Sequence, residues 1–350
     1  MANRRLDAVY VTRPVSIAYL TGFHADPHER LMALAVRSDG ATLIVPALER
    51  QSAAEHASNA AVVAWRDGED PYELVDRALA GLTEVGVEKD HLSLLSAELI
   101  TSRTGVSELV DVGTEIVRLR LIKHEAEIEK LARAAAITDA ACDAAFSRLR
   151  AGQSEIEIAL MLGSLIGELG GTLAFDSLVQ SGPNSAMSHL GPSSRKLAPG
   201  DFVLLDFGAA FDGYRADTTR MAVVGEPSAR HREIHAVVLE AHDAAIAAVR
   251  PGATTGDVDA AARHSIDAAG YGERFFHRVG HGLGLEIHEA PSLDPGSQTV
   301  LEPGMVFTIE PGVYIPGFGG VRIEDDVVVE DGGCRVLTKA DRSLRVITHT

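Results

Sequence analysis

The chain contains little cysteine and far fewer basic than acidic residues. Its 350 residues include two cysteines, Cys142 and Cys334, which are too few for a disulfide framework or a cysteine-rich zinc site. Lysine and arginine total 32 against 50 aspartate and glutamate residues, so the formal net charge of −18 repels nucleic-acid phosphates and anionic lipid headgroups. We therefore expect a protein of a reducing, cytoplasmic compartment whose partners are neither nucleic acid nor a membrane surface.

Long apolar segments and several catalytic motifs are also absent from the sequence. No uncharged apolar run reaches the roughly 18 residues that a membrane span requires, and Asp7, Arg13 and Pro14 interrupt the N-terminal segment before a signal-peptide core forms. The sequence has no glycine-rich dinucleotide loop, no P-loop with Gly-Lys, no Gly-x-Ser-x-Gly and no His-Glu-x-x-His. These absences argue against a secreted or membrane protein, a nucleotide enzyme, a serine hydrolase and a zincin.

The length and the hydrophobic pattern indicate two domains. At roughly 150 residues per domain, the 350 residues correspond to about two. The first third alternates short strand-like and helical segments, whereas long amphipathic helical patterns follow Asp111 and strand-like segments return from Phe202. We expect a small α/β domain over residues 1–115 and a larger domain over residues 116–350, which together make an α+β protein. Cys142 lies on the apolar stripe of the first long helix and is expected in the core.

One pair of acidic residues lies in apolar, strand-like sequence, where a carboxylate needs a partner or a metal. Asp206 follows an apolar run, and Asp217 stands beyond the dipeptide Asp212-Gly213, which is a strong β-hairpin signal. A two-residue turn at this dipeptide pairs residue 206 with 219 and residue 208 with 217. Asp206 and Asp217 then face the same side as diagonal neighbours, roughly 7–8 Å apart at the backbone, where both can reach one cation. Two unrelated acids on a surface hairpin are the alternative.

A second acidic pair, Glu310 and Glu324, also closes apolar runs. If residues 316–320 turn about Gly317, residues 310 and 324 stand opposite each other with their Cβ atoms roughly 5 Å apart. This register is a hypothesis that requires a symmetric loop. Together with the imidazole of His281, which lies between two glycines, the four carboxylates would form an oxygen-rich site whose charge two divalent cations balance.

In the order and spacing of these residues, the sequence resembles the pita-bread metallopeptidases, a family that includes aminopeptidase P, prolidase and methionine aminopeptidase. The likeness covers about residues 120–345. Because five ligand positions occur in the family's order, chance is an unattractive explanation. The matching blocks are Asp206-Phe207-Gly208, Asp217-Thr218-Thr219-Arg220, His281-Gly282-Leu283-Gly284-Leu285, Thr308-Ile309-Glu310-Pro311-Gly312 and Arg322-Ile323-Glu324-Asp325.

The resemblance implies a pita-bread catalytic domain with two divalent metal ions per subunit, manganese by preference, with cobalt or zinc as alternatives. It makes Glu310 the proton shuttle between the attacking water and the leaving nitrogen. His189 and His288 would hold the substrate and stabilise the tetrahedral intermediate, while His277 and Arg322 match substrate-binding positions. The implied metal ligands are Asp206, Asp217, His281, Glu310 and Glu324, with Asp217 and Glu324 bridging the two ions.

The resemblance extends to residues 1–115, which look like the creatinase-like N-terminal domain that prolidases and aminopeptidases P carry. Methionine aminopeptidases generally lack this domain, and the metal-free creatinases do not keep the ligand set. Dimers are common in the family, so the resemblance implies a homodimer that acts on peptides with proline at the second position. A catalytically inactive peptide-binding module of the same fold is the alternative of another class, against which the five intact ligand positions argue.

The choice between prolidase and aminopeptidase P depends on substrate length. A Xaa-Pro dipeptide ends in a carboxylate beside the scissile bond, so a strict dipeptidase benefits from a nearby cation. Many prolidases resemble one another in an arginine shortly after the second histidine, where this chain has Ser292. We therefore expect aminopeptidase P activity and keep prolidase as the alternative, because another arginine such as Arg195 could supply the charge.

Overall fold

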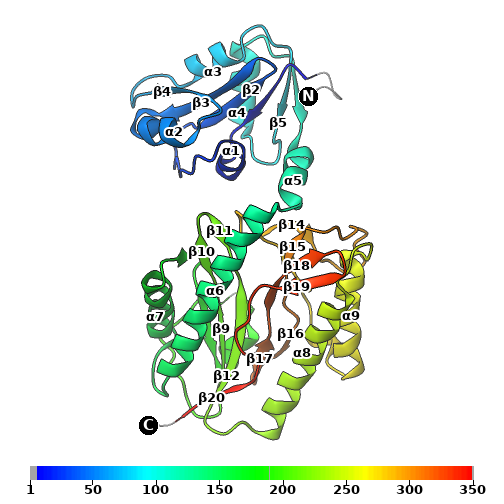
Figure 1. Cartoon of the computed structure of the whole chain (residues 1–350). Coiled ribbons are helices and arrows are strands. Elements are labelled where there is room, and N and C mark those ends of the chain that lie inside the picture. Colours follow the sequence, from blue (N-terminus) through cyan, green and yellow to red (C-terminus); the bar gives the residue numbers. More distant parts are fainter. Residues whose placement is uncertain (1–5, 189, 349–350) are drawn as a thin grey trace. The chain divides into compact units, whose positions relative to one another are not determined.

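The computed structural model describes residues 6–188 and 190–348 and comprises two compact units, residues 1–120 and 121–350 (Figure 1). Both units combine helices and sheets, which confirms the expected fold class of a small α/β domain followed by a larger α+β domain. The boundary expected after residue 115 falls inside helix α5 (Gly113–Leu121). Among the described helices, none is both long and apolar enough to cross a membrane.

The first unit is built on a six-stranded sheet with the order β4-β3-β2-β1-β5-β6. Ala8 and Tyr10 of β1 join one hydrophobic cluster and the intervening Val9 packs against a second, so both faces of the sheet are covered. Trp65, the one tryptophan of the sequence, ends β4 and donates its indole N–H to the carbonyl oxygen of Leu31. The elements are β1 (Ala8–Val11), α1 (Pro14–Thr21), β2 (Ala33–Arg37), β3 (Gly40–Pro46), η2 (Ala47–Glu49), α2 (Arg50–His56), β4 (Ala61–Trp65), α3 (Tyr72–Ala78), β5 (Glu84–Val87), α4 (Leu94–Arg103) and β6 (Glu108–Asp111).

In the second unit, two pairs of helices enclose the central strands (Figure 1). Val203 of β9 packs in the cluster with α6 and α7, whereas its neighbours Phe202 and Leu204 pack in the cluster with α8 and α9. The larger sheets have the orders β20-β12-β9-β8 and β14-β13-β15-β18-β19, and the smaller ones β11-β10-β7 and β16-β17. The helices are α6 (Glu125–Arg148), α7 (Glu155–Glu168), η3 (Gly182–Ala186), α8 (Ala229–Ala248), α9 (Thr255–Ala268) and η4 (Gly272–Arg274). The strands are β7 (Thr172–Leu173), β8 (Leu178–Ser181), β9 (Phe202–Phe207), β10 (Ala209–Phe211), β11 (Tyr214–Arg215), β12 (Thr218–Val224), β13 (His281–Gly282), β14 (Glu289–Ser292), β15 (Val306–Ile309), β16 (Gly312–Ile315), β17 (Gly319–Arg322), β18 (Asp325–Glu330), β19 (Gly333–Val336) and β20 (Arg345–Ile347).

Local sequence signals account for where the long helices begin and which face they bury. Ser154 and Glu157 form the predicted capping box at the start of α7, with each side chain accepting the backbone N–H of the other residue at 3.3 and 2.6 Å. Cys142 of α6 is fully buried in the core, as its place on the apolar stripe predicts, and burial raises the pKa of its thiol to about 12.

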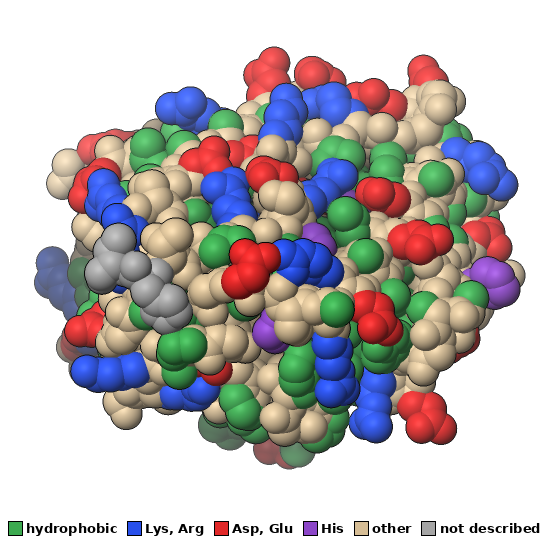
Figure 2. All heavy atoms as spheres, turned by 90° about the horizontal axis from the view of Figure 1, so that it is seen from below, with side chains coloured by type: hydrophobic (Ala, Val, Ile, Leu, Met, Phe, Trp, Pro, Cys, Tyr) green, Lys and Arg blue, Asp and Glu red, His purple; other side chains and the backbone are tan. Residues whose placement is uncertain are grey.

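On the face of the molecule shown in Figure 2, acidic and basic side chains are interspersed.

The hairpin predicted at Asp212-Gly213 is present with the predicted register. Asp206 pairs with Thr219 in the ladder of β9 and β12, and the two turn residues have φ values of 48° and 83°. Both values lie in the left-handed region that such a two-residue turn requires. The register therefore brings Asp206 and Asp217 to the same face of the hairpin.

The second predicted hairpin also turns about Gly317. Gly312 of β16 pairs with Arg322 of β17, and continuing this register places residue 310 opposite residue 324. Glu324 in addition donates its backbone N–H to the carbonyl oxygen of Thr219 at 3.3 Å. This bridge joins the two hairpins at the point where all four acidic residues meet.

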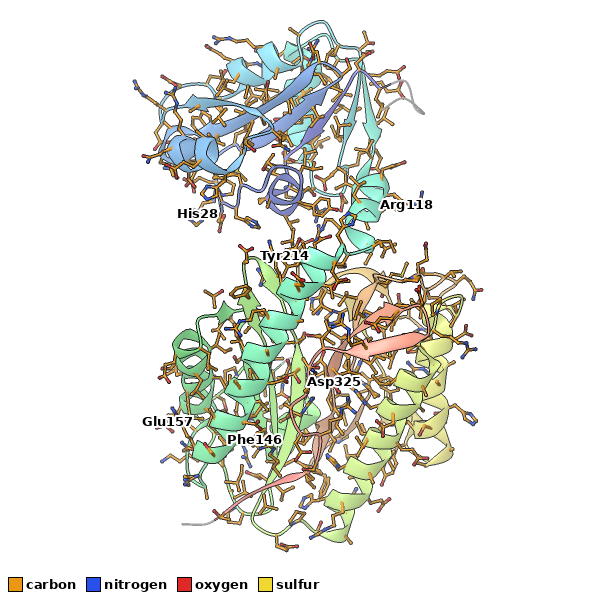
Figure 3. All side chains as sticks on the ribbon, viewed as in Figure 1. His28, Arg118, Phe146, Glu157, Tyr214 and Asp325 are labelled. Atoms are coloured by element: carbon orange, nitrogen blue, oxygen red, sulfur yellow. The ribbon has the colours of Figure 1, made fainter. Side chains whose placement is uncertain are left out.

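A buried ion-pair network lies next to this bridge, around Asp325 in the interior of the second unit (Figure 3). Arg220 is 1% exposed and donates to Asp325 Oδ1 at 2.7 Å and to the carbonyl oxygen of Glu324 at 2.6 Å. His242 Nε2 lies 3.1 Å from Asp325 Oδ2, and Arg342 Nε lies 2.5 Å from the same oxygen. Burial opposes ionisation of Asp325, but His242 and the two arginines hold its pKa well below its ordinary value.

Replacing Arg220 should destabilise the second unit strongly. Arg220→Met leaves the buried carboxylate of Asp325 without its main counter-charge, and breaking a buried pair costs about 3–5 kcal/mol. The measurement is urea unfolding followed by circular dichroism. Arg335→Met is the control, because its pair with Glu330 is 44% and 49% exposed, and such pairs contribute about 0–1 kcal/mol. Equal destabilisation by the two variants would contradict a special role for the buried network.

Candidate metal centre

A pocket of about 290 Å³ in the second unit gathers most of the residues that the sequence analysis selects. All five predicted metal ligands line it, together with His277, His288 and Arg322. His189 lies outside the described residues. The described lining consists of Phe175, Leu178, Ser188, Asp206, Asp217, His277, Arg278, His281, Ile287, His288, Glu310, Arg322 and Glu324.

The five predicted ligands come from five strand ends that converge on this pocket. Asp206 belongs to β9 and Asp217 directly precedes β12. His281 begins β13, Glu310 directly follows β15, and Glu324 lies between β17 and β18. The two hairpins and the bridge between them therefore bring distant parts of the sequence together. Thr219 and Glu324, which form the bridge, are 105 positions apart.

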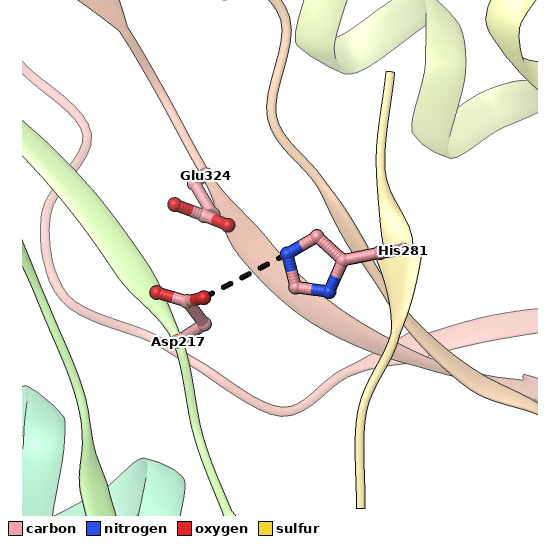
Figure 4. Close-up of side chains that lie close together, drawn as sticks. All are labelled: Asp217, His281 and Glu324. Atoms are coloured by element: carbon pink, nitrogen blue, oxygen red, sulfur yellow. Dashed lines mark ion pairs between the residues drawn. The ribbon is translucent and has the colours of Figure 1, made fainter. Parts of the chain in front are cut away.

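Three of these residues already form a compact ligand set. One ligand atom each of Asp217, His281 and Glu324 lies within 4.8 Å of the other two (Figure 4). His281 Nε2 lies 3.8 Å from Asp217 Oδ2 and 3.3 Å from Glu310 Oε1. Figure 4 shows the carboxylates of Asp217 and Glu324 directed to this same nitrogen.

Arg322 is the positive charge among these carboxylates. Its Nη2 donates to Asp206 Oδ2, and its Nε lies 4.0 Å from Glu310 Oε2 and 3.9 Å from Glu324 Oε2. Thr219 contributes a neutral contact, because its hydroxyl donates to Glu324 Oε2 at 2.6 Å. This guanidinium offsets only part of the charge of the four carboxylates, so the site is short of positive charge.

The protonation equilibria show the same shortage of positive charge. Burial raises the pKa of Glu310 to about 7, and burial together with neighbouring carboxylates raises those of Asp217 and Glu324 well above their ordinary values. Burial and the nearby His288 lower the pKa of His281 to about 3, so its imidazole is neutral and able to ligate. Asp217 Oδ1 is buried with no hydrogen-bond partner among the described residues. This oxygen-rich donor set with one imidazole fits divalent metal ions.

His277 joins a hydrogen-bond chain that the sequence analysis did not find. Its Nε2 lies 2.9 Å from the hydroxyl of Tyr314, which also accepts from Arg322 Nη1 at 3.2 Å. Gly312 provides the space, because a Cβ atom there would lie 2.5 Å from the Tyr314 hydroxyl. The alternation of side chains along β16 could have revealed Tyr314, since residues 312 and 314 share one face of the strand.

His288 stands edge-on against His281. The two ring centroids are 4.2 Å apart with an interplanar angle of 78°, and both rings line the pocket. Gln180 of β8 holds the segment around residue 189, because its Nε2 donates to the carbonyl oxygens of Met187 and Leu190 at 2.8 and 2.9 Å. These two bonds fix the described backbone on either side of residue 189.

Arg278 is the second arginine of the pocket lining, and the sequence analysis did not select it. Its Nη1 donates to the hydroxyl of Ser292 on β14 at 2.8 Å, and no ion pair joins it to a carboxylate within the described part of the chain. Arg195, which the sequence analysis suggests as a source of positive charge, instead forms a bidentate ion pair with Asp201 at 2.6 and 2.9 Å. Arg195 is not part of the described pocket lining.

Comparisons with known proteins cover nearly the whole chain. Residues 129–331 match metallopeptidase family M24, and residues 1–122 match the Creatinase/Prolidase N-terminal domain. The chain is 41% identical to the Xaa-Pro dipeptidase of Lactobacillus helveticus over 349 residues, covering 97% of this chain and 95% of the relative. The structure of a Xaa-Pro dipeptidase from Bacillus anthracis superposes with a TM-score of 0.93 at 37% identity, covering 99% and 96% of the two chains. An X-Pro aminopeptidase from Thermotoga maritima gives a TM-score of 0.90 at 32% identity, with 98% of each chain covered.

We expect Asp217→Asn and Glu324→Gln each to lower the affinity for divalent metal by more than about 100-fold. Outer-shell changes in metal sites already cost about 10- to 100-fold, and these two side chains are predicted direct ligands. Metal content after dialysis, measured by inductively coupled plasma mass spectrometry, checks this. Glu330→Gln, on an exposed side chain, is the control. Unchanged metal content in both site variants would remove Asp217 and Glu324 from the ligand set.

Metal binding should also release protons and weaken below neutral pH. Because the pKa of Glu310 in the metal-free protein is about 7, this carboxyl is protonated below pH 7 and must lose its proton before it can ligate. The affinity for metal therefore falls as the pH decreases through about 7. Isothermal titration calorimetry in two buffers of different ionisation enthalpy measures the released protons. Identical heats in both buffers would contradict the raised pKa.

Proposed function

Because the chain belongs to metallopeptidase family M24, we propose that it is a prolidase, a metal-dependent hydrolase of Xaa-Pro dipeptides. The Lactobacillus helveticus and Bacillus anthracis proteins are both named Xaa-Pro dipeptidases, and each is more similar in sequence than the Thermotoga maritima aminopeptidase. The expectation of aminopeptidase P activity is therefore less well supported than its alternative. It depended on the absence of an arginine at position 292.

The observation that carries the proposal is the place of Arg278. A dipeptidase needs a cation near the scissile bond to pair with the substrate carboxylate. Arg322 has its three guanidinium nitrogens engaged by Asp206, Tyr314 and Thr219. Arg278 is held by Ser292 through one nitrogen, which leaves a charged guanidinium edge for the carboxylate. In this proposal Ser292 holds Arg278 in place, and Arg278 supplies the positive charge that an arginine at position 292 would otherwise supply.

We assign two divalent ions to Asp206, Asp217, His281, Glu310 and Glu324. When bound, they would supply Lewis acidity to the scissile carbonyl and to the attacking water. Manganese suits the four carboxylates, and cobalt or zinc are the alternatives. The homodimer and the cytoplasmic location expected from the sequence remain predictions.

The protein's own side chains would bind the substrate and move the proton. Glu310 takes a proton from the attacking water and passes it to the proline nitrogen, which has no hydrogen of its own in the substrate. His288 and His189 hold the substrate and stabilise the charge of the tetrahedral intermediate. Arg322 and His277, linked through Tyr314, keep the carboxylates and the pocket wall in place.

The first measurement compares a Xaa-Pro dipeptide, its C-terminal amide and a Xaa-Pro tripeptide on the same preparation, with manganese, cobalt or zinc added to chelated protein. We expect kcat/KM to be highest for the dipeptide. Arg278→Met should lower the dipeptide-to-amide ratio of kcat/KM by about 10- to 100-fold, because a charge-assisted hydrogen bond is lost. Arg274→Met, on an exposed arginine outside the described pocket lining, is the control.

Each other outcome identifies an alternative function. Preference for the tripeptide would make the protein an aminopeptidase P. Activity on the dipeptide with an unchanged ratio in Arg278→Met would leave the prolidase assignment in place and remove Arg278 from it. No cleavage of any of the three peptides with any metal would favour the inactive peptide-binding module.

A further inference from the structure

A buried ion pair supports the loop that carries His288, and the chemistry described above does not use it. Lys123 Nζ lies 2.8 Å from Glu289 Oε1, and the two side chains are 1% and 8% exposed. The residues are 166 positions apart in the sequence. Because withdrawing two charges from water is costly and the pair repays that cost only with good geometry, simple stabilisation is a weak explanation for this pair.

The carboxylate of Glu289 lies at the centre of the loop between β13 and β14. Its Oε2 accepts the backbone N–H of Glu286 at 3.3 Å. Gly284 packs directly against it, since a Cβ atom at this position would lie 2.6 Å from Glu289 Oε1. Arg215 anchors the same loop through the carbonyl oxygens of Gly284 and Leu285, at 2.9 and 3.1 Å. The loop is therefore folded around the Glu289 carboxylate.

The orientation of His288 follows from that of Glu289. His288 directly precedes Glu289, the first residue of β14. Glu289 points to the buried Lys123, and His288 lines the pocket against His281. Because one peptide bond joins the two residues, fixing the Glu289 carboxylate restricts where the His288 imidazole can stand.

Lys123 is fixed independently of Glu289. Its backbone N–H donates to the carbonyl oxygen of Gly304 at 2.9 Å, and the preceding Ile122 bridges Met305. These contacts hold the segment directly before α6 against the start of β15. The cation that Glu289 meets is therefore held in place by backbone contacts of its own segment.

We propose that Glu289 is a positioning residue for His288 and that Lys123 is the counter-ion that allows Glu289 to be buried. The kinetic part of this inference rests on the proposed dipeptide hydrolysis. The positioning part concerns the loop itself and has a readout without substrate.

Two double variants separate positioning from stability. Lys123→Met with Glu289→Gln and Lys123→Met with Glu289→Leu both remove both charges, so neither leaves an unpaired buried charge. They differ because the glutamine carbonyl can still accept the N–H of Glu286, whereas leucine cannot. We expect kcat for the dipeptide to stay within about threefold of the original in the glutamine variant and to fall about 10- to 100-fold in the leucine variant, with equal metal content and a smaller change in KM.

A double-mutant cycle tests whether the effect passes through His288. In a His288→Ala background, adding Lys123→Met with Glu289→Leu should lower kcat by less than about twofold more, because the residue being positioned is already absent. Lys130→Met is the matched control, since this lysine of α6 is 39% exposed and pairs with the exposed Asp212. It should leave kcat unchanged.

Hydrogen–deuterium exchange of residues 284–288, measured by mass spectrometry, gives the substrate-free readout. The glutamine variant should keep the protection of the original chain, and the leucine variant should lose it. Equal exchange in the two variants, or kcat values that follow thermal stability across the set, would overturn the inference. If the original chain cleaves no Xaa-Pro peptide with any metal, the proposed function fails, and the exchange measurement still decides the positioning.

Discussion

Four carboxylates that face one small pocket, three of them buried and that of Glu310 largely buried, are the constraint on which the second unit depends. Burial and mutual repulsion raise the pKa values of Asp217, Glu310 and Glu324, and Arg322 offsets only part of the negative charge. Such a cluster persists in a folded protein when the backbone around it is held by other interactions and when cations complete its charge. The divalent metals used by family M24 supply cations of the required charge.

The fold meets this constraint by placing acids at strand ends and stiffening the strands behind them. Two tight hairpins set the spacing within each acidic pair, and the Thr219–Glu324 bridge sets the spacing between the pairs. Behind the bridge, Arg220 ties the same backbone to Asp325 through buried hydrogen bonds. The predicted metal ligands thus lie at or next to the ends of regular strands that a charged core supports.

Most of this centre could be predicted because its spacing is local. The dipeptide Asp212-Gly213 and the turn about Gly317 fix both hairpin registers, and with them the faces on which the four acids lie. Contacts between segments far apart in the sequence have no comparable local pattern that would predict them. Lys123 and Glu289 pair across 166 positions of sequence, and neither local segment indicates the other. The single position Ser292 suggested a missing cation, for which we propose Arg278 of the preceding segment. A residue's role in a pocket depends on what its neighbours in space hold, and a sequence read position by position does not contain that information.

The place of Trp65 has a practical consequence for spectroscopy of the whole chain. As the one tryptophan of the sequence, buried in the first unit with its indole N–H bonded to Leu31, it makes intrinsic tryptophan emission a reporter of that unit alone. The unit that contains the four carboxylates has no emitter of its own at wavelengths selective for tryptophan. Emission therefore follows the first unit alone, whereas circular dichroism follows the backbone of both units, and a difference between their melting curves resolves the two units without cutting the chain.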